Sequence, residues 1–139
     1  MNKLDRFIKV QEQDYFRALK EVKNGRKLTH WMWYIFPQLK GLGHSAMSEF
    51  YGIDGIEEAK EYLKHKILGK RLIKISNELL KLDTNNPIQI FGEIDSLKLK
   101  SCMTLFDYVS ENEVFDKVLQ RFYNGEKDLK TISICNRNM

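Results

Sequence analysis

The sequence has few of the residues that mark disulfide-rich or membrane-spanning proteins. Among its 139 residues are two prolines and two cysteines, and Cys102 and Cys135 form no CxxC or Cys/His spacing. Cysteines in this pattern are expected to be reduced thiols in a cytoplasmic protein. No apolar run approaches the roughly 20 residues of a membrane span, and nothing before the first helical pattern resembles a signal peptide. We therefore predict a cytoplasmic protein without a membrane partner.

A strong excess of one charge is also absent. The formal net charge is +4, and the lysines are spread among glutamates as on solvated helix faces. This balance argues against a nucleic-acid partner, which would require the lysines to gather on one face. Hydrophobic residues make up 42% and aromatic residues 12% of the chain, a composition typical of a globular domain with a buried core.

Familiar catalytic and cofactor motifs are missing as well. His30, His44 and His65 have no ligand-like spacing and no carboxylate pair to complete a site, so no metal site is predicted. The chain has no GxSxG elbow, Walker loop or dinucleotide fingerprint, and no cofactor is indicated. Cys102 falls on an apolar helical face, where a cysteine usually acts as a small buried hydrophobe. Whether the protein is an enzyme is left open by these absences.

What the sequence does contain is helical periodicity along most of its length. Apolar stripes predict helices over residues 4–23, with a break near Gln13-Asp14, and over residues 66–82 and 95–109. Asp95 or Ser96 is expected to cap the third of these helices. Further helices are expected after the Asp54-Gly55 turn, and after residues 110–113, which have the Ser-x-x-Glu form of a capping box. Residues 88–92 fit either a helical turn or a short strand.

These patterns predict one all-α globular domain over residues 1–139. It would contain about six to eight helices in an orthogonal or array-like packing, with a core over about residues 4–124. The sequence shows no linker, repeat or low-complexity run that would divide it. Residues 126–139 are expected to form a C-terminal tail whose Ile132 and Ile134 dock before the chain frays.

One stretch, residues 28–52, differs from the amphipathic segments around it. It holds both tryptophans, two of the three histidines and one of the two prolines. Residues 30–36 are apolar and aromatic on every side, and we interpret them as a short helix that ends before Pro37. A glycine-containing loop and a second short helix, from His44 or Ser45 to Tyr51, are expected to follow.

The first candidate site is the loop that leads into this second short helix. Gly41 and Gly43 allow close backbone approach, and free N–H groups at a helix start beside Ser45 suit a phosphate or carboxylate. The alternative is structural: the two glycines make a tight turn and Ser45 caps the helix.

The second candidate combines His30 with Trp31 and Trp33. Indole rings offer flat, rigid surfaces for a ligand ring, and histidine can donate, accept or carry a proton. The alternative is that these large aromatic side chains are core struts, since such residues dominate protein interiors.

The third candidate is Lys98, which falls at the edge of the apolar arc of its predicted helix. A lysine there either extends along the surface to water or enters a partly enclosed pocket and pairs with an anion. Ser101 and Thr104 lie progressively further round the same helix, towards its polar side.

Three blocks of the chain together resemble a known family. They are THWMWYIFPQLKGLGHSAMSEFYGI, YLKHKILGKRL and IFGEIDSLKLKSCMTLF, at residues 29–53, 62–72 and 90–106. They look like the domain-of-unknown-function 1810 family, some of whose members carry the label calpastatin, which we do not take as a guide to function. The resemblance covers about residues 5–124. It implies a mainly α-helical, stand-alone cytoplasmic bacterial protein and no established activity.

Several positions of these blocks are polar or aromatic, as a ligand pocket requires. The candidate ligand residues are therefore His30, Trp31, Trp33, Gln38, Gly41, Gly43, Ser45, Tyr51, Lys98, Ser101 and Thr104. His44 often stands where relatives carry arginine, which weakens an anion-binding role for that side chain because histidine is charged only when protonated.

We hypothesise that the stretch from His30 to Ser45 and the helix from Asp95 to Val109 face one another and line a cleft. The cleft would bind a small anionic or nucleotide-like ligand. If catalysis occurs there, His30 is the best candidate for a general acid or base, with Lys98 stabilising negative charge. The alternatives are a protein-interaction module that uses the aromatic stretch, with an unknown partner, and a weak nucleic-acid binder.

Overall fold

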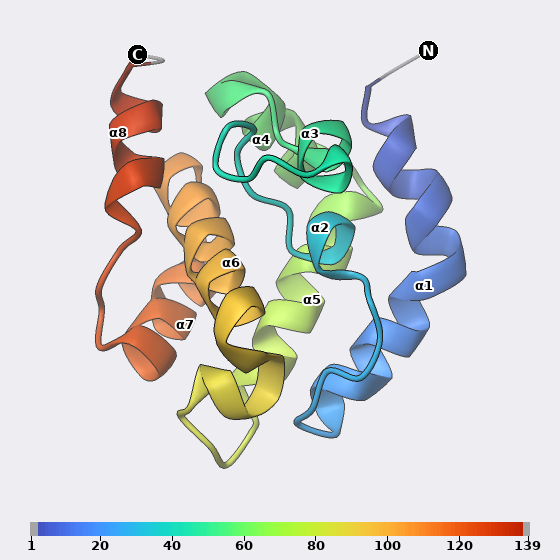
Figure 1. The fold of residues 1–139 in the computed structure, drawn as a ribbon, viewed down its shortest axis with the longest axis vertical. Coiled ribbons are helices and arrows are strands. Elements are labelled where there is room, and N and C mark those ends of the chain that lie inside the picture. The colour runs from blue at the N-terminus through green and yellow to red at the C-terminus, as the bar shows by residue number, and fades with distance from the viewer. Residues whose placement is uncertain (1–2, 138–139) are drawn as a thin grey trace.

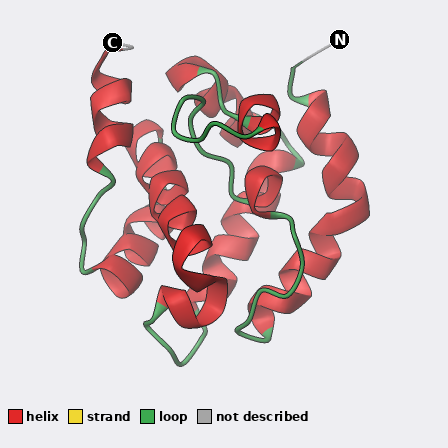
Figure 2. Cartoon of the chain, in the orientation of Figure 1, coloured by secondary structure: helices red, strands yellow, loops and turns green. Residues whose placement is uncertain are grey.

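The protein is entirely α-helical over residues 3–137, which are the residues that the computed structural model describes (Figure 1, Figure 2). The predicted all-α fold is confirmed, and its eight helices agree with the expected number. The helices are α1 (Asp5–Lys23), α2 (Met32–Ile35), α3 (Ala46–Tyr51), α4 (Gly55–Lys64), α5 (Leu68–Leu80), α6 (Pro87–Val109), α7 (Glu113–Tyr123) and α8 (Leu129–Arg137).

Helix α5 lies at the centre of the packing. It contacts α1 on one side and α7 on the other, and α4 also packs against it. The long helix α6 contacts α4, α7 and α8 (Figure 1). The central stretch, residues 28–52, crosses between α1 and α6, and its Leu39 forms an isolated parallel β-bridge with Ile53. This crossing brings the aromatic segment against the first half of α6.

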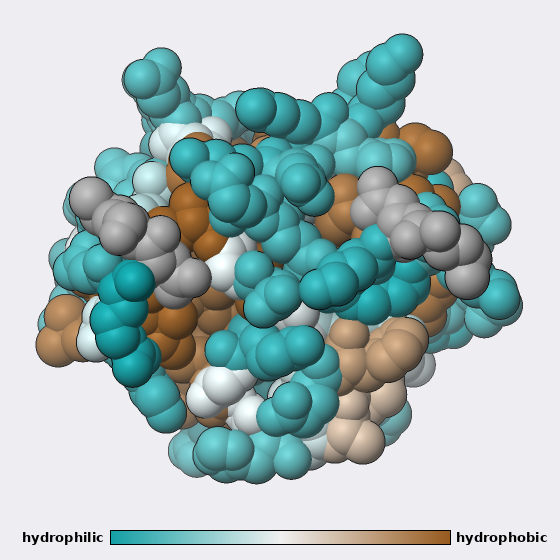
Figure 3. All heavy atoms as spheres, turned by 90° about the horizontal axis from the view of Figure 1, so that it is seen from above, coloured by the Kyte–Doolittle hydropathy of each residue, from teal (hydrophilic) through white to brown (hydrophobic). Residues whose placement is uncertain are grey.

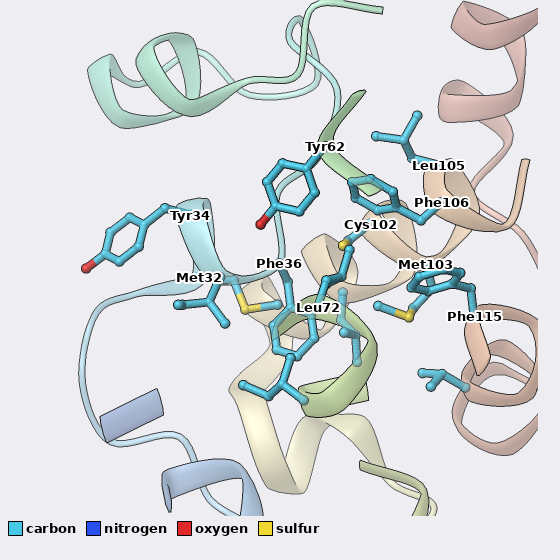
Figure 4. Packing of buried hydrophobic residues seen from close by; sticks show 14 of the residues in the cluster. Met32, Tyr34, Phe36, Tyr62, Leu72, Cys102, Met103, Leu105, Phe106 and Phe115 are labelled. Atoms are coloured by element: carbon cyan, nitrogen blue, oxygen red, sulfur yellow. The ribbon is translucent and has the colours of Figure 1, made fainter. Parts of the chain in front are cut away.

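One hydrophobic core joins these elements. Side chains from five helices point towards one another in Figure 4, among them Met32 of α2, Tyr62 of α4, Leu72 of α5, Phe106 of α6 and Phe115 of α7. The stripe predicted on α5 is confirmed, because Leu68, Leu72, Ile75 and Leu79 are all buried. Apolar burial of this kind is the main stabilising contribution in a domain of this size.

The break expected near Gln13-Asp14 is wrong, since α1 is continuous from Asp5 to Lys23. Of the two residues that suggested it, Gln13 is exposed and Asp14 accepts a hydrogen bond from the Tyr34 hydroxyl. Gln11 is buried, and its Nε2 donates to the backbone oxygen of Tyr34 at 2.7 Å and to the hydroxyl of Tyr62 at 2.9 Å. Polar groups are tolerated in a core when each has such a partner.

Two predicted helix starts are also wrong. Helix α6 begins at Pro87 with Asn86 as its cap, so residues 88–91 are helical, and the chain kinks at Gly92, whose backbone is not helical and whose φ is +82°. A positive φ is readily adopted by glycine, which explains the residue type at the kink. Helix α7 begins at Glu113, and its cap is Asn112 rather than Ser110.

The expected tail contains a helix. Residues 129–137 form α8, which packs on α6, and the residues it buries are Thr131 and Cys135, while Ile132 and Ile134 are only partly buried. Residues 138–139, where fraying was expected, lie outside the described part. Cys102 and Cys135 are both buried free thiols, and burial raises the pKa of each.

One face of the molecule is mainly polar. Seen from above in Figure 3, hydrophilic side chains cover most of the face and hydrophobic atoms show only in patches between them. Within residues 3–137, none of the helices combines the length and apolar character needed to cross a bilayer.

Candidate functional site

A hollow of about 510 Å³ lies between the segment before α2 and the kink of α6. Its wall on one side comes from residues 27–33 and on the other from residues 91–95. The volume falls within the range of small-ligand sites, roughly 300–1,000 Å³. The lining residues are Lys27, His30, Met32, Trp33, Phe91, Gly92, Glu93, Ile94 and Asp95.

The kink at Gly92 shapes this hollow. Just before it, the ring of Phe91 meets Trp31 at a centroid distance of 6.4 Å and Phe36 at 5.9 Å, both edge to face. These contacts hold the first turns of α6 against the core. The backbone then changes direction at Gly92, and the following residues lie along the opening.

Two lysines share one carboxylate beside the hollow. The Asp95 carboxylate forms ion pairs with the ammonium groups of Lys27, at 3.0 Å, and of Lys98, one helical turn away, at 3.5 Å. The ammonium group of Lys98 also lies 4.9 Å from the centroid of the Trp33 ring. A lysine over an indole face is attracted by the ring electrons. The Trp33 ring, the Lys98 ammonium group and the Asp95 carboxylate therefore lie within a few ångströms of one another.

The segment that carries His30 and Trp33 is fixed by a buried carboxylate. Glu21 accepts hydrogen bonds from the backbone N–H groups of Leu28 and Thr29, at 2.7 and 3.0 Å, and from the indole Nε1 of Trp31 at 2.9 Å. Its second oxygen accepts from the Thr29 hydroxyl at 2.7 Å. Burial by itself would raise the pKa of Glu21, but these four hydrogen bonds outweigh it and lower the pKa to about 2.

The two tryptophans have different roles. Trp31 is fully buried, and its one polar group is bound to Glu21. Its inclusion among the candidate ligand residues is therefore corrected, because its ring is part of the core. Trp33 is partly exposed and lines the hollow together with the exposed His30.

Gln38 and Tyr51 lie on the other side of Trp33. With Ser48 and Gly52 they surround a crevice of about 10 Å³, which Trp33 also lines. Such a volume holds about one water molecule. Gln38 and Tyr51 do not line the main hollow, and Trp33 is the residue that the crevice and the hollow share. Burial raises the pKa of the Tyr51 hydroxyl, which therefore keeps its proton.

The glycine loop makes a turn and a cap. Gly41 has a φ of +98°, and a side chain at Gly43 would come within 2.5 Å of the Ser48 hydroxyl. The Ser45 hydroxyl accepts from the backbone N–H of Ser48 at 3.1 Å. The hollow is not lined by Gly41, Gly43 or Ser45. Their contacts fit the alternative given for them, in which the glycines make a tight turn and Ser45 caps the helix.

Ser101 and Thr104 are also absent from the hollow, and both are buried. The Ser101 hydroxyl donates to the backbone oxygen of Leu97, and that of Thr104 donates to the backbone oxygen of Lys100 at 2.8 Å. Thr104 additionally accepts from the backbone N–H of Asp128 at 3.0 Å, which fixes the chain before α8. Both are structural residues, and their inclusion in the ligand site is corrected.

Of the nine lining residues, only His30 and Trp33 were among the candidate ligand residues. The residues missed are Lys27, Met32, Phe91, Gly92, Glu93, Ile94 and Asp95. Asp95 was assigned a capping role, and Lys27 lay outside the resemblance blocks. The available signal was the Phe-Gly pair before an acidic residue, because a glycine inside a helical pattern often marks a kink. Over residues 3–137, no cluster of three or more metal-ligating side chains is found.

Comparison with known proteins gives one family and one solved structure. Residues 1–135 match the family described as "Protein of unknown function (DUF1810)". The crystal structure of a conserved hypothetical protein from Mycobacterium tuberculosis is 40% identical, with a TM-score of 0.94, and the alignment covers 96% of each chain. No curated protein matches this chain at a comparable level.

Proposed function

Since the chain belongs to the family of proteins of unknown function DUF1810, no activity follows from its relatives, and we propose a function from the hollow itself. The protein binds a small anionic or nucleotide-like ligand there, with a planar group of the ligand against Trp33. The observation that carries this proposal is the position of Lys98 at the edge of the hollow. Lys98 is not a lining residue, but its ammonium group lies 4.9 Å from the centroid of the Trp33 ring and 3.5 Å from the Asp95 carboxylate, and both of these residues line the hollow.

Lys98 is better placed than Lys27 to receive a ligand. The side chain of Lys98 is 21% exposed and its distance to Asp95 is 3.5 Å, whereas Lys27 is 9% exposed and pairs more closely, at 3.0 Å. A ligand carboxylate or phosphate can therefore take Lys98 as its partner while Lys27 keeps Asp95 neutralised. Charge-assisted hydrogen bonds of this kind are among the stronger polar contacts in binding sites.

His30 gives the site a further polar group. It lines the hollow and is exposed, and within residues 3–137 its side chain has no hydrogen-bond partner. A catalytic histidine is usually oriented by a second group. We therefore propose binding, with His30 in contact with the ligand. If the ligand is turned over, His30 is the first residue to replace in a test of proton transfer.

The interaction-module alternative required a broad exposed tryptophan surface. Trp31 is buried, and Trp33 is only partly exposed, with the Lys98 ammonium group over its ring. The concave arrangement around Trp33 favours a small ligand over a protein face.

The first prediction is that Lys98→Ala weakens ligand binding with little loss of stability. A thermal-shift screen of the wild-type protein against nucleotides, ADP-ribose, NAD, sugar phosphates and simple anions identifies the ligand. A ligand at a hundred times its dissociation constant adds about 2.7 kcal/mol and raises the melting temperature. Loss of the charge-assisted contact is expected to weaken affinity roughly 10- to 100-fold.

Lys100→Ala is the matched control. Lys100 lies on the same helix, is also 21% exposed, pairs with Glu126 at 3.6 Å and lies 5.9 Å from the Tyr123 ring. Unlike Lys98, it contacts neither Trp33 nor Asp95, the two lining residues of the hollow that Lys98 touches. Its replacement should leave the affinity unchanged. Equal affinity of both variants and the wild type would remove Lys98 from the site, and a screen without any hit would contradict the proposal.

A further inference from the structure

A second surface of the protein, separate from the hollow, has a high local excess of positive charge. Residues 64–81 contain six basic side chains and one acidic side chain, Glu78, for a formal charge of +5. The whole chain has a formal charge of +4, so the remainder is slightly acidic. Basic residues therefore clearly outnumber acidic ones in α5 and the segments that flank it, whereas the two signs nearly balance in the rest of the chain.

The fold displays this charge on one face. The apolar side of α5 is buried in the core, which leaves Lys70 and Lys74 exposed four residues apart on the helix. Lys66, in the turn before α5, is exposed as well. Residues four apart lie on the same side of a helix, about 6 Å from one another. Over residues 3–137, these three lysines form no ion pair within 4 Å.

Helix α1 extends the same face. It runs beside α5 in Figure 1, and the two helices are in contact. Glu78 shows how close their charges lie. Its pKa is lowered first by a hydrogen bond from Lys81 at 2.9 Å, and further by the charges of Lys81, of Lys23 on α1 and of Lys74. One carboxylate thus lies among three lysines from two helices.

An exposed aromatic side chain lies at the edge of this face. Phe16 of α1 is 71% exposed, and its ring packs edge to face on Tyr15 at 5.6 Å. Arg71 of α5 lies 5.1 Å from the same Tyr15 ring, and the Tyr15 hydroxyl donates to the Arg71 backbone oxygen at 2.8 Å. Phe16 is therefore held next to the basic residues of α5, although a phenylalanine gains nothing from exposure to water.

We propose that this face, formed by Phe16, Lys23, Lys66, Lys70, Arg71 and Lys74, binds single-stranded nucleic acid. The lysines follow the phosphate backbone, and one base stacks on Phe16. Proteins that bind single strands combine a basic track with aromatic platforms in this way. A lipid surface is less suited to it, because the apolar side of α5 is committed to the core and cannot enter a membrane.

The test is fluorescence anisotropy with a labelled single-stranded oligonucleotide of about 20 nucleotides, long enough for a single-strand site. Binding is expected at about 50 mM salt and should weaken at about 200 mM. Phe16→Ala should weaken it about tenfold, as for loss of one stacked base. Lys70→Ala and Lys74→Ala should each reduce the logarithmic salt dependence by about 0.7.

Matched controls come from α8, where Leu129 is 80% exposed and Lys130 is also exposed. Leu129→Ala and Lys130→Ala should leave binding unchanged, as should Lys98→Ala, so failure of the ligand proposal does not affect this test. Absence of oligonucleotide binding at low salt would overturn the inference. So would a Phe16→Ala variant that binds like Leu129→Ala, or binding to anionic lipid vesicles without binding to the oligonucleotide.

Discussion

Replacing Glu21 with alanine is expected to destabilise the protein by about 4 kcal/mol, measured as the free energy of unfolding at neutral pH. The glutamate side chain is only 7% exposed and accepts four hydrogen bonds from the segment that follows α1. Each buried donor left without a partner costs about 1–3 kcal/mol, and these costs are not fully additive because the segment can relax. The donor that cannot reach water without unpacking the core is the indole of Trp31.

The charge of Glu21 predicts a specific dependence on pH. Its pKa is about 2 in the folded protein and 4.5 in its ordinary state. Because the folded pKa is the lower one, the ionised group contributes its full stability above pH 4.5, and this contribution is lost as the pH falls towards 2. The difference corresponds to about 3 kcal/mol.

Glu21→Gln separates the hydrogen bonds from the charge. Glutamine keeps the oxygen that accepts from Leu28, Thr29 and Trp31, and its amide can donate to the Thr29 hydroxyl. We expect urea denaturation to show Glu21→Gln more stable than Glu21→Ala at pH 7. Between pH 4.5 and 2.5 the wild type should lose more stability than Glu21→Gln. Parallel curves for the two proteins over that range would show that Glu21 is not the titrating group.

The contrast between Glu21 and the apolar stripes shows which features the sequence predicts. The stripe of Leu68, Leu72, Ile75 and Leu79 has a helical period that survives any packing arrangement, so both the helix and its buried face were predictable. Glutamate on an amphipathic helix is usually exposed, and nothing in its spacing distinguishes Glu21 from its solvated neighbours. Its burial depends on the path of the chain after α1, which local patterns do not specify.

In the candidate site, too, local patterns predicted some features and tertiary contacts determined the others. The hypothesis that the central stretch faces the helix beyond Asp95 agrees with the contact of Trp33 with Lys98. The contact of Trp31 with Phe91 lies before the kink, outside the predicted helix. The sequence did not separate Trp31 from Trp33, because both lie at the start of a helix of only four residues, too short for a periodic pattern. Which ring is buried was decided by the tertiary hydrogen bond to Glu21.

Gly69 is a residue whose importance the sequence understates. By helix propensity alone, a glycine in the first turn of a helix costs only about 0.5–1 kcal/mol relative to alanine. The structure gives the reason for its presence: a Cβ atom built on Gly69 would lie 2.0 Å from the backbone oxygen of Leu63 in α4. The two helices meet here at the close turn through His65, whose backbone oxygen accepts from the Gly69 N–H at 3.0 Å.

Gly69→Ala is therefore expected to destabilise the protein by about 3 kcal/mol or more, opposite in sign to the usual gain from alanine in a helix. The clash is with backbone, so no side-chain rotation relieves it, and α4 and α5 must separate. For a chain of this length the melting temperature should fall by roughly 10 °C or more. Lys70→Ala, at the next and exposed position of the same turn, should change it little. If thermal unfolding followed by circular dichroism gives Gly69→Ala a melting temperature equal to or above that of Lys70→Ala, then the close approach of α4 and α5 at this turn is wrong.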